Sequence, residues 1–142
     1  MNLNTKHFGE IEIDEKGILD FPEGLPGFEN LKRFIVLNRE NVEIPINWLQ
    51  SIDDGEVVFV IIDPFYVKKD YDFDIDDDEI SILKVKEVKD ILIYSIVVVP
   101  KNIKDMTANL RAPIIINTLN KKGKQVVLHN TEYEINFKIF KG

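Results

Sequence analysis

Carboxylates at alternate positions are the side chains of this chain with the clearest capacity for chemistry. Residues 70–79 carry seven acids and no base, and Asp70, Asp72 and Asp74 have the spacing of ligands in a calcium-binding loop. An EF-hand also needs glycine at its sixth position and glutamate at its twelfth. A loop that starts at Asp70 has isoleucine and serine at those positions, and loops that start at Asp72 or Asp74 fail in the same way. We therefore reject an EF-hand.

These seven acids also carry the whole net charge of the protein. The 142 residues include 18 Lys or Arg and 25 Asp or Glu, which gives a formal charge of −7. Without residues 70–79, which we call the acidic segment, 18 acids (25 − 7) face 18 bases. Direct binding to nucleic acid needs a positive surface. The charge therefore predicts no direct nucleic-acid contact and favours a basic partner.

Apolar residues alternate with the acids inside this segment. If the segment is a strand, Tyr71, Phe73 and Ile75 point inward and the carboxylates form one outward row. Such a row prevents edge-to-edge pairing of sheets, and it equally suits a basic partner. The sequence leaves both interpretations open.

Other catalytic and metal-binding patterns are missing from the sequence. The chain has no Cys and two His, His7 and His129, so a thiolate zinc site, a disulfide framework and a Cys nucleophile are excluded. Gly123 and Lys124 do not complete a P-loop, because Thr118 stands at the place of the first glycine. No GxGxxG or GxSxG motif occurs. We predict a protein that is not an enzyme and has no cofactor or metal.

The same counts indicate the compartment. Absence of Cys is typical of a reducing environment. The longest uncharged apolar stretch, residues 91–100, has about half the length of a membrane span, and the first residues lack a signal-peptide core. We expect a cytoplasmic protein that does not contact membrane.

The elements that must position the acidic segment are mostly strands. Ile (21) and Val (13) far outnumber Ala (2), which favours strands over helices. We predict one domain, residues 1–142, with a barrel or sandwich fold and one or two short helical turns. Expected strands are 10–13, 17–21, 33–37, 57–63, 91–99, 107–117, 125–129 and 132–140, with a hairpin loop between 117 and 125. Helical turns are expected at 46–51, which contains Trp48 and Leu49, and at 79–85, capped by Asp77 or Asp78.

Two loops are rich in proline, glycine and aromatics. Residues 21–28 alternate Pro and Gly between Phe21 and Phe28, which favours a structural corner over a binding loop. Asp63 and Pro64 end a buried strand and are followed by Phe65 and Tyr66, just before the acidic segment. Aromatics beside a charged rim are typical of a protein interface.

Seven segments, in order along the chain, resemble the FliW family of flagellar assembly factors. They are FGEIEID (8–14), FPEGLPGFE (21–29), WLQSIDD (48–54), VIIDPF (60–65), IVVVP (96–100), MTANLRAPIIIN (106–117) and KKGKQVVL (121–128). The resemblance spans nearly the whole chain, and the ordered set is far more specific than any single motif. It implies an antiparallel β-barrel-like fold.

The resemblance also implies a function. The family is expected to be non-enzymatic and to bind flagellin and CsrA, an RNA-binding translational repressor of flagellin. Newly made flagellin would sequester the factor, and after export of flagellin the free factor would bind CsrA and relieve repression. Alternatives are a dedicated flagellin chaperone without a translational role, a small-ligand-binding β-barrel and a metal-dependent hydrolase.

Partner-binding residues are expected in the acidic segment, beside it, and in the segment that resembles MTANL. They are Phe65, Asp70, Tyr71, Asp72, Asp74, Asp76, Asp77, Asp78, Met106, Asn109 and Leu110. Carboxylates placed near a basic RNA-binding protein would weaken its hold on phosphates by repulsion.

Overall fold

The structure is a computed structural model that describes residues 1–38, 45–129 and 131–140. The strands of this part are β1 (Asn2–Thr5), β2 (Gly9–Glu12), β3 (Leu19–Asp20), β4 (Arg33–Leu37), β5 (Ile46–Ser51), β6 (Val58–Ile62), β7 (Ile91–Val98), β8 (Thr107–Ala108), β9 (Ile114–Asn117), β10 (Lys122–Gln125) and β11 (Phe137–Lys138). Short α-helices, α1 (Pro64–Val67) and α2 (Asp77–Leu83), lie between β6 and β7. Single 3-10 turns occupy Glu15–Gly17, Val88–Asp90 and Ile103–Asp105.

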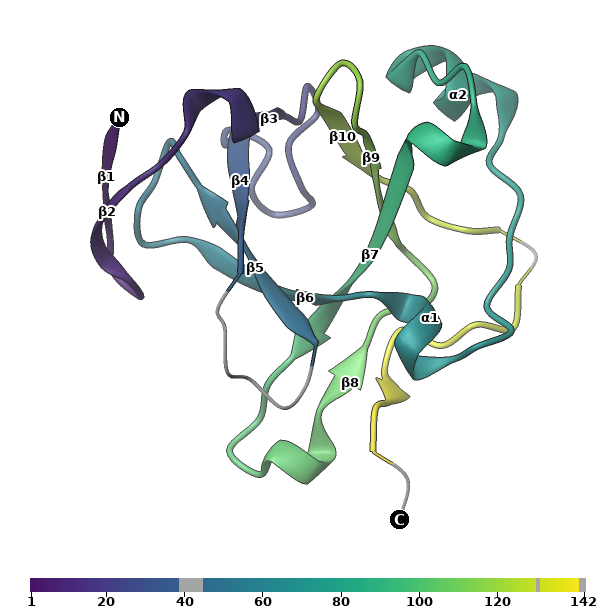
Figure 1. Cartoon of the computed structure of the whole chain (residues 1–142). Coiled ribbons are helices and arrows are strands. Elements are labelled where there is room, and N and C mark those ends of the chain that lie inside the picture. Colours follow the sequence, from purple (N-terminus) through teal and green to yellow (C-terminus); the bar gives the residue numbers. More distant parts are fainter. Residues whose placement is uncertain (39–44, 130, 141–142) are drawn as a thin grey trace.

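Nine of the described strands form one sheet that closes on itself (Figure 1). Neighbours follow the order β11-β8-β7-β6-β5-β4-β3-β10-β9, and β9 also pairs with β7. The first half of β7 pairs with β9, whereas its second half pairs with β6 on one edge and β8 on the other. This ring confirms the prediction of a mostly β, barrel-like fold with short helices. One pair, β3 with β10, is parallel, so the sheet is mixed where a fully antiparallel one was predicted.

The ring has an inner core and outer clusters. Side chains from β3 to β6 and from β9 meet inside it, among them Phe34, Leu49 and Ile61, and each of these three is fully buried. On β9, Ile114 and Ile116 join this inner cluster, while Ile115 joins an outer cluster with Leu83 of α2. Both faces of the strand are therefore buried, which explains its unbroken run of isoleucines.

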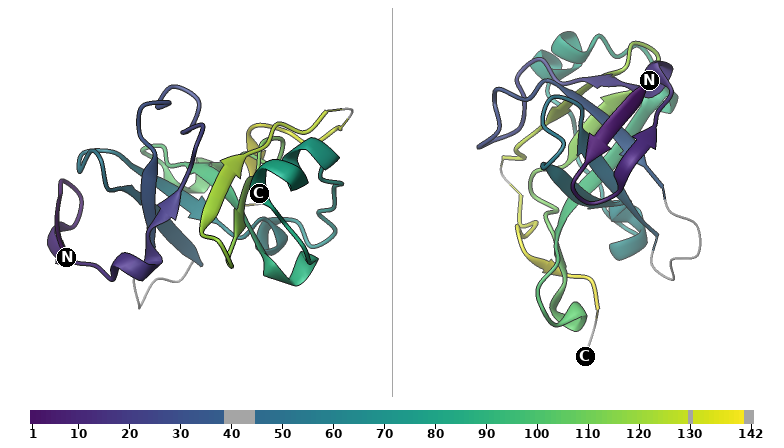
Figure 2. Two further views of the ribbon diagram at one scale, coloured as in Figure 1. Left: turned by 90° about the horizontal axis from the view of Figure 1, so that it is seen from above. Right: turned by 90° about the vertical axis from the view of Figure 1, so that its left-hand side faces the viewer.

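A hairpin of β1 and β2 forms a separate sheet at the opposite end of the molecule from α2 (Figure 2). The prediction placed a strand at 10–13 and missed β1. The hairpin is tied to the β5–β6 turn because the Lys6 N–H donates to the Gly55 carbonyl at 3.0 Å. A side chain at Gly55 would collide with the carbonyl of Asn4.

The helical turn predicted at 46–51 is wrong. These residues form β5, which pairs with β4 on one edge and β6 on the other. Trp48, Leu49, Gln50 and Ser51 are all buried, so the strand shows no alternation of apolar and polar residues. Gln50 is tolerated inside because its amide donates to backbone carbonyls of the β5–β6 turn, including that of Val57 at 3.1 Å.

The strand predicted at 132–140 is also wrong over most of its length. A turn at Ile135 and Asn136 interrupts it, and the strand that remains is Phe137–Lys138. In an alternating strand over 132–140, Ile135 would face inward with Tyr133, yet its side chain is 60% exposed. Tyr133 and Ile139 do pack against the sheet, in two different clusters. Tertiary contacts on either side of the turn outweigh the local β pattern.

Several predicted boundaries shift. The segment 107–117 is one strand region interrupted at 109–113, and the interruption is held by the Asn109 side chain, which accepts from the N–H groups of Arg111 and Ala112. Strands at 17–21 and 125–129 are replaced by β3 and β10. Gly123 therefore lies in β10 and not in the hairpin turn. The ring of Phe21 packs so closely on Gly123 that a Cβ there would lie 2.6 Å from its Cζ.

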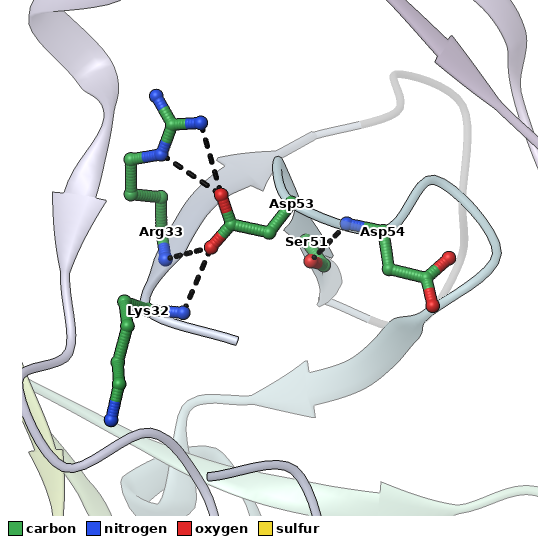
Figure 3. A network of polar contacts seen from close by, with 5 residues as sticks. All are labelled: Lys32, Arg33, Ser51, Asp53 and Asp54. Carbon is green, nitrogen blue, oxygen red and sulfur yellow. Dashed lines mark hydrogen bonds and ion pairs between the residues drawn. The ribbon is translucent and has the colours of Figure 1, made fainter. Parts of the chain in front are cut away.

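The loop 21–33 and the β5–β6 turn 51–57 form a polar corner (Figure 3). One oxygen of Asp53 accepts from the backbone N–H groups of Lys32 (2.9 Å) and Arg33 (3.0 Å), and the other accepts from the Arg33 guanidinium at 3.0 Å. Burial alone would raise the pKa of the Asp53 carboxyl, but these donors outweigh burial and hold the pKa below its usual value. Gly24, at φ +67°, provides the turn that the loop needs. The loop is thus the structural corner that its composition favours.

Candidate functional site

An apolar groove of about 560 Å³ lies between β7 and the acidic segment. Figure 1 shows the elements that border it, β7 and the coil that runs from α1 to α2. Its apolar lining is Phe65, Phe73, Ile75, Ile80, Val85, Val88, Ile91 and Ile93, and its charged lining is Asp72, Asp74, Lys86 and Glu87. Much of this apolar surface faces solvent, since Phe65 is 40% exposed and Val88 is 85% exposed. Apolar surface left open beside charges is typical of a binding site.

The floor of the groove is the outer face of β7. Ile93 lies opposite Ile115 of β9, which belongs to the outer cluster that also contains Ile91. The neighbouring residue Tyr94 packs against the inner cluster instead. Alternation along β7 therefore places the side chains of Ile91 and Ile93 outside the ring.

The wall of the groove is the first part of the acidic segment, which is extended but forms no strand. Residues 71–76 are outside any sheet, and α2 begins at Asp77, so the segment does not form the strand that was considered for it. The predicted alternation is nevertheless present. Tyr71 is buried, Phe73 and Ile75 are half-buried, and the acids between them are exposed.

Aromatic packing and two tyrosine hydroxyls hold this wall in place. The ring of Tyr71 lies 4.7 Å from that of Tyr133, 5.3 Å from Phe73 and 5.8 Å from Phe65. The Tyr71 hydroxyl donates to the Leu110 carbonyl. The Tyr133 hydroxyl accepts from the Asp72 N–H at 2.9 Å and donates to the Asp72 carbonyl at 2.8 Å. Burial, with a smaller contribution from Tyr133, raises the pKa of Tyr71, so this donor stays protonated.

Helix α2 closes the far end of the groove. Its C-terminal carbonyl at Leu83 accepts from the amides of Asn117 (2.9 Å) and Asn120 (3.0 Å). The predicted helix was 79–85 with Asp77 or Asp78 as cap; the helix instead begins at Asp77, and the residue at the cap position, Asp76, makes no side-chain cap bond. Three acids in its first turn suit the positive end of the helix dipole.

Lys124 joins α2 to the polar corner. Its ammonium lies 2.7 Å from one oxygen of Glu79 and 2.9 Å from Glu23. Burial lowers the pKa of Lys124, but the hydrogen bonds and charges of these two glutamates outweigh it and raise the pKa above its usual value. Loop 21–33 and the acidic segment are therefore linked through one cation on β10.

Among the described residues, two carboxylates at or beside the rim form ion pairs, Glu87 with Lys89 at 3.1 Å and Asp70 with Lys68. Asp70 forms an ion pair with Lys68 at 2.9 Å, and this hydrogen bond lowers the pKa of Asp70. No ion pair or side-chain hydrogen bond within the described residues involves the carboxylates of Asp72, Asp74, Asp76, Asp77 or Asp78, all of which are exposed. Like charges crowded on one rim raise the local affinity for cations and basic groups.

The structure brings part of the predicted site together. Phe65 and the acids border the groove or the helix beside it, whereas Tyr71 is 3% exposed and joins them through its ring. In the segment that resembles MTANL, Leu110 is buried and contacts Tyr71, and Asn109 holds the break between β8 and β9. Met106 is buried in a different cluster, with Ile62 and Val97. These three residues lie where they stabilise the fold.

Sequence reasoning missed the other half of the groove. The missed residues are Val85 and Val88 from the connection between α2 and β7, and Ile91 and Ile93 from the start of β7. An unbroken apolar run such as that of β7 favours a strand with both faces buried, but of its residues Ser95 and Val97 are buried, whereas Leu92 and Val98 are 46% and 63% exposed. The one signal in the sequence was Val88, an apolar residue between Glu87 and Lys89.

Metal binding and membrane insertion find no support in the described part of the chain. No group of three or more His, Asp or Glu side chains there could enclose a metal ion. None of its helices has the length and apolar character to cross a membrane.

An apolar groove with an acidic rim, on a small closed β-sheet, is typical of proteins that dock on another macromolecule. Comparison with known proteins gives the family. A model of the FliW protein family matches residues 2–139. This chain belongs to the FliW family of flagellar assembly factors.

Individual relatives cover nearly the whole chain. It is 50% identical over 133 residues to the flagellar assembly factor FliW of Alkaliphilus metalliredigens, which spans 94% of this chain and 82% of that protein. It is 48% identical over 135 residues to that of Caldanaerobacter subterraneus subsp. tengcongensis, spanning 95% and 90%. A crystal structure of the flagellar assembly factor FliW superimposes with a TM-score of 0.93 at 39% identity, covering 100% of this chain and 99% of the other.

Proposed function

We propose that this chain is a non-enzymatic regulator of flagellar assembly that binds flagellin and, when free, binds the repressor CsrA and relieves repression of flagellin synthesis. Membership of the family of flagellar assembly factors supports the assembly role. The observation that carries the proposal is the exposed row of carboxylates at Asp72, Asp74 and Asp76, which have no partner among the described side chains. A protein that binds RNA is basic, so this row suits it.

The row also supplies a physical route to antagonism. When the two proteins are bound, the carboxylates lie near the basic RNA-binding surface and reduce its attraction for phosphates. The effect acts over about one Debye length, roughly 10 Å at 0.1 M salt, so direct overlap with the RNA site is not required. Repulsion by several weak charges adds up, and high salt screens it.

Charge neutralisation tests this mechanism. We expect the variant with Asp72, Asp74, Asp76 and Asp78 all changed to Asn to release RNA from the repressor less well than wild type in a filter-binding assay at low salt. The difference should shrink at high salt, and each single change should be weak. A control changes Glu10 and Glu12 of β2, two exposed acids at the far end of the molecule, to Gln. Equal release by the quadruple variant and wild type at low salt would reject the electrostatic route.

The proposed switch between partners can be tested by asking whether flagellin and the repressor bind this protein at the same time. Flagellin and the repressor should not bind fully at the same time, because a standard interface takes about 800 Å² on each partner and this is a small protein. Native mass spectrometry of the three proteins at saturating concentration should show binary complexes. A stable ternary complex would contradict the switch.

A further inference from the structure

Among the described strands, none pairs with the edge of β7 beside the groove over the first half of β7. Pairing of β6 with β7 runs from Val60 opposite Val97 to Ile62 opposite Ser95 and stops there. Continued in register, the ladder would place Pro64 opposite Ile93. Proline has no N–H, and Pro64 begins α1. The ladder therefore ends one hydrogen-bonding position before Ile93.

The backbone groups of Ile93 point toward this open edge. On the β9 side, the Thr118 N–H donates to the carbonyl of Asp90. Because the backbone groups of successive residues point to alternate edges in an antiparallel ladder, those of Leu92 and Tyr94 also face β9. Those of Ile93 face the other way, as do those of Ser95, which pairs with β6. One N–H and one C=O at Ile93 thus lie beyond the end of the β6 ladder.

The opposite wall of the groove is extended as well. Residues 73–75 belong to no strand in the described structure, and the side chains of Phe73 and Ile75 point into the groove. The groove is therefore a slot between two extended stretches of backbone, with apolar side chains inside it. The carboxylates of Asp72, Asp74 and Glu87 stand at its rim, where Lys86 is the one cation among its described lining residues.

We infer that the slot binds a short extended segment of a basic protein, which adds as a strand to the edge of β7 at Ile93. This inference rests on the proposed function, because it assigns a binding mode to the same site. Strand addition uses backbone hydrogen bonds for affinity and alternate side chains for specificity. Every second side chain of the segment is apolar and packs on Ile91 and Phe73. The others are Lys or Arg and face the carboxylates of the rim.

A helix in the groove would not use these features. An α-helix satisfies its own backbone groups, so it would leave the N–H and C=O of Ile93 without a strand partner. An acidic segment would meet the rim with like charge. The open edge and the rim charge therefore select an extended and basic occupant.

A synthetic peptide tests the inference directly with the whole chain. The probe is a short acetylated and amidated peptide of alternating lysine and valine. At saturation, amide exchange of Ile93 measured by NMR should slow about tenfold or more, while that of Leu92, which already faces β9, should stay unchanged. The same peptide with N-methyl groups on every second residue cannot donate to the edge, and it should bind about tenfold more weakly.

Two matched variants locate the site. Val88 and Ile103 are both exposed β-branched residues, at 85% and 58%, and each is the first residue of a 3-10 turn. Val88 lines the groove, and Ile103 is outside it. Val88→Asn should weaken peptide binding about three- to tenfold because it removes apolar contact, and Ile103→Asn should leave binding unchanged.

The outcomes separate the inference from the proposed function. The inference is overturned if the peptide fails to bind, binds without protecting Ile93, binds equally when N-methylated, or is unaffected by Val88→Asn. A peptide of alternating glutamate and valine that binds as well would overturn the basic specificity. If full-length flagellin and CsrA both fail to bind wild type while the peptide results hold, the proposed function fails and the binding mode stands.

Discussion

The polar corner and the acidic segment use the same side chain in opposite ways. At the corner, both oxygens of Asp53 accept hydrogen bonds, one from backbone N–H groups and the other from a guanidinium, and the side chain is 26% exposed. In the acidic segment, Asp72, Asp74 and Asp76 are exposed and have no described side-chain partner. A paired carboxylate stabilises its own loop, whereas a solvated one adds little to stability and stays available to another molecule. The two regions therefore differ in what their carboxylates do: those of the corner stabilise the fold, and those of the acidic segment remain exposed.

The largest effect is expected beneath the corner, where Phe21 packs on Gly123. A Cβ at position 123 would lie 2.6 Å from Cζ of Phe21, whose side chain is fully buried. Gly123→Ala should therefore lower the free energy of unfolding by about 1–3 kcal/mol, the usual cost of overpacking. Urea denaturation measures it. Gly17→Ala is the control, because the nearest atom there, Cδ1 of Ile35, lies at 3.4 Å. Equal stability of the two variants would show that the ring of Phe21 shifts to accept a Cβ at position 123.

Removing the central carboxylate of the corner should have the next largest effect. Asp53→Ala leaves the N–H groups of Lys32 and Arg33 without their acceptor. Because water reaches this site in part, we expect a loss of about 1–2 kcal/mol in urea denaturation. The matched change Asp74→Ala should leave the denaturation midpoint unchanged. A similar loss in both variants would remove the distinction between the two regions.

The contribution of Asp53 to stability should also depend on pH. The pKa of Asp53 is lower in the folded protein than its ordinary value of 3.8. A lowered pKa stabilises the fold above the unfolded pKa, and this contribution disappears as pH falls through the folded value. The stability difference between wild type and Asp53→Asn should therefore be constant at neutral pH and shrink below about pH 4. Denaturation midpoints between pH 2 and 7 measure it, and a difference that persists unchanged at pH 2 would contradict the assignment.

Lys124, which joins the two regions, should give an intermediate and local effect. Lys124→Met leaves the carboxylates of Glu23 and Glu79 without their shared cation. We expect a loss of about 1 kcal/mol and faster amide exchange in α2, with no change in β5. Lys124→Arg, which keeps the charge, is the control. Unchanged exchange in α2 would show that its C-terminal contacts with Asn117 and Asn120 suffice to hold it.

The smallest effect on stability is expected in the acidic segment itself. Changing Asp72, Asp74 and Asp76 together to Asn should leave the urea midpoint unchanged or raise it slightly at low salt, because it removes repulsion between like charges. Circular dichroism and denaturation measure this outcome. A clear loss of stability would mean that these carboxylates have a structural role like that of Asp53.

The local sequence pattern was sufficient to predict the strands that are rich in apolar residues and end at turn-forming residues. It predicted β4, β6 and β7, the hairpin turn before β10, and the alternation of Tyr71, Phe73 and Ile75 with acids. These features depend on neighbouring residues, which the sequence displays directly. It failed at β5, where Gln50 and Ser51 are buried by strands on both edges, and at 132–140, where a turn at Ile135 interrupts an alternating run.

By itself, the sequence determined that the chain is mostly β, that its net charge lies in residues 70–79, and that its ordered motifs match one family. Tertiary structure alone decided which strands close the ring, which of the predicted site residues are buried, and that Val88 and Ile93 face the acidic segment across a groove. The reason is physical. Composition and alternation are properties of adjacent residues, whereas ring closure, burial and an unpaired strand edge depend on contacts between residues that are distant in sequence.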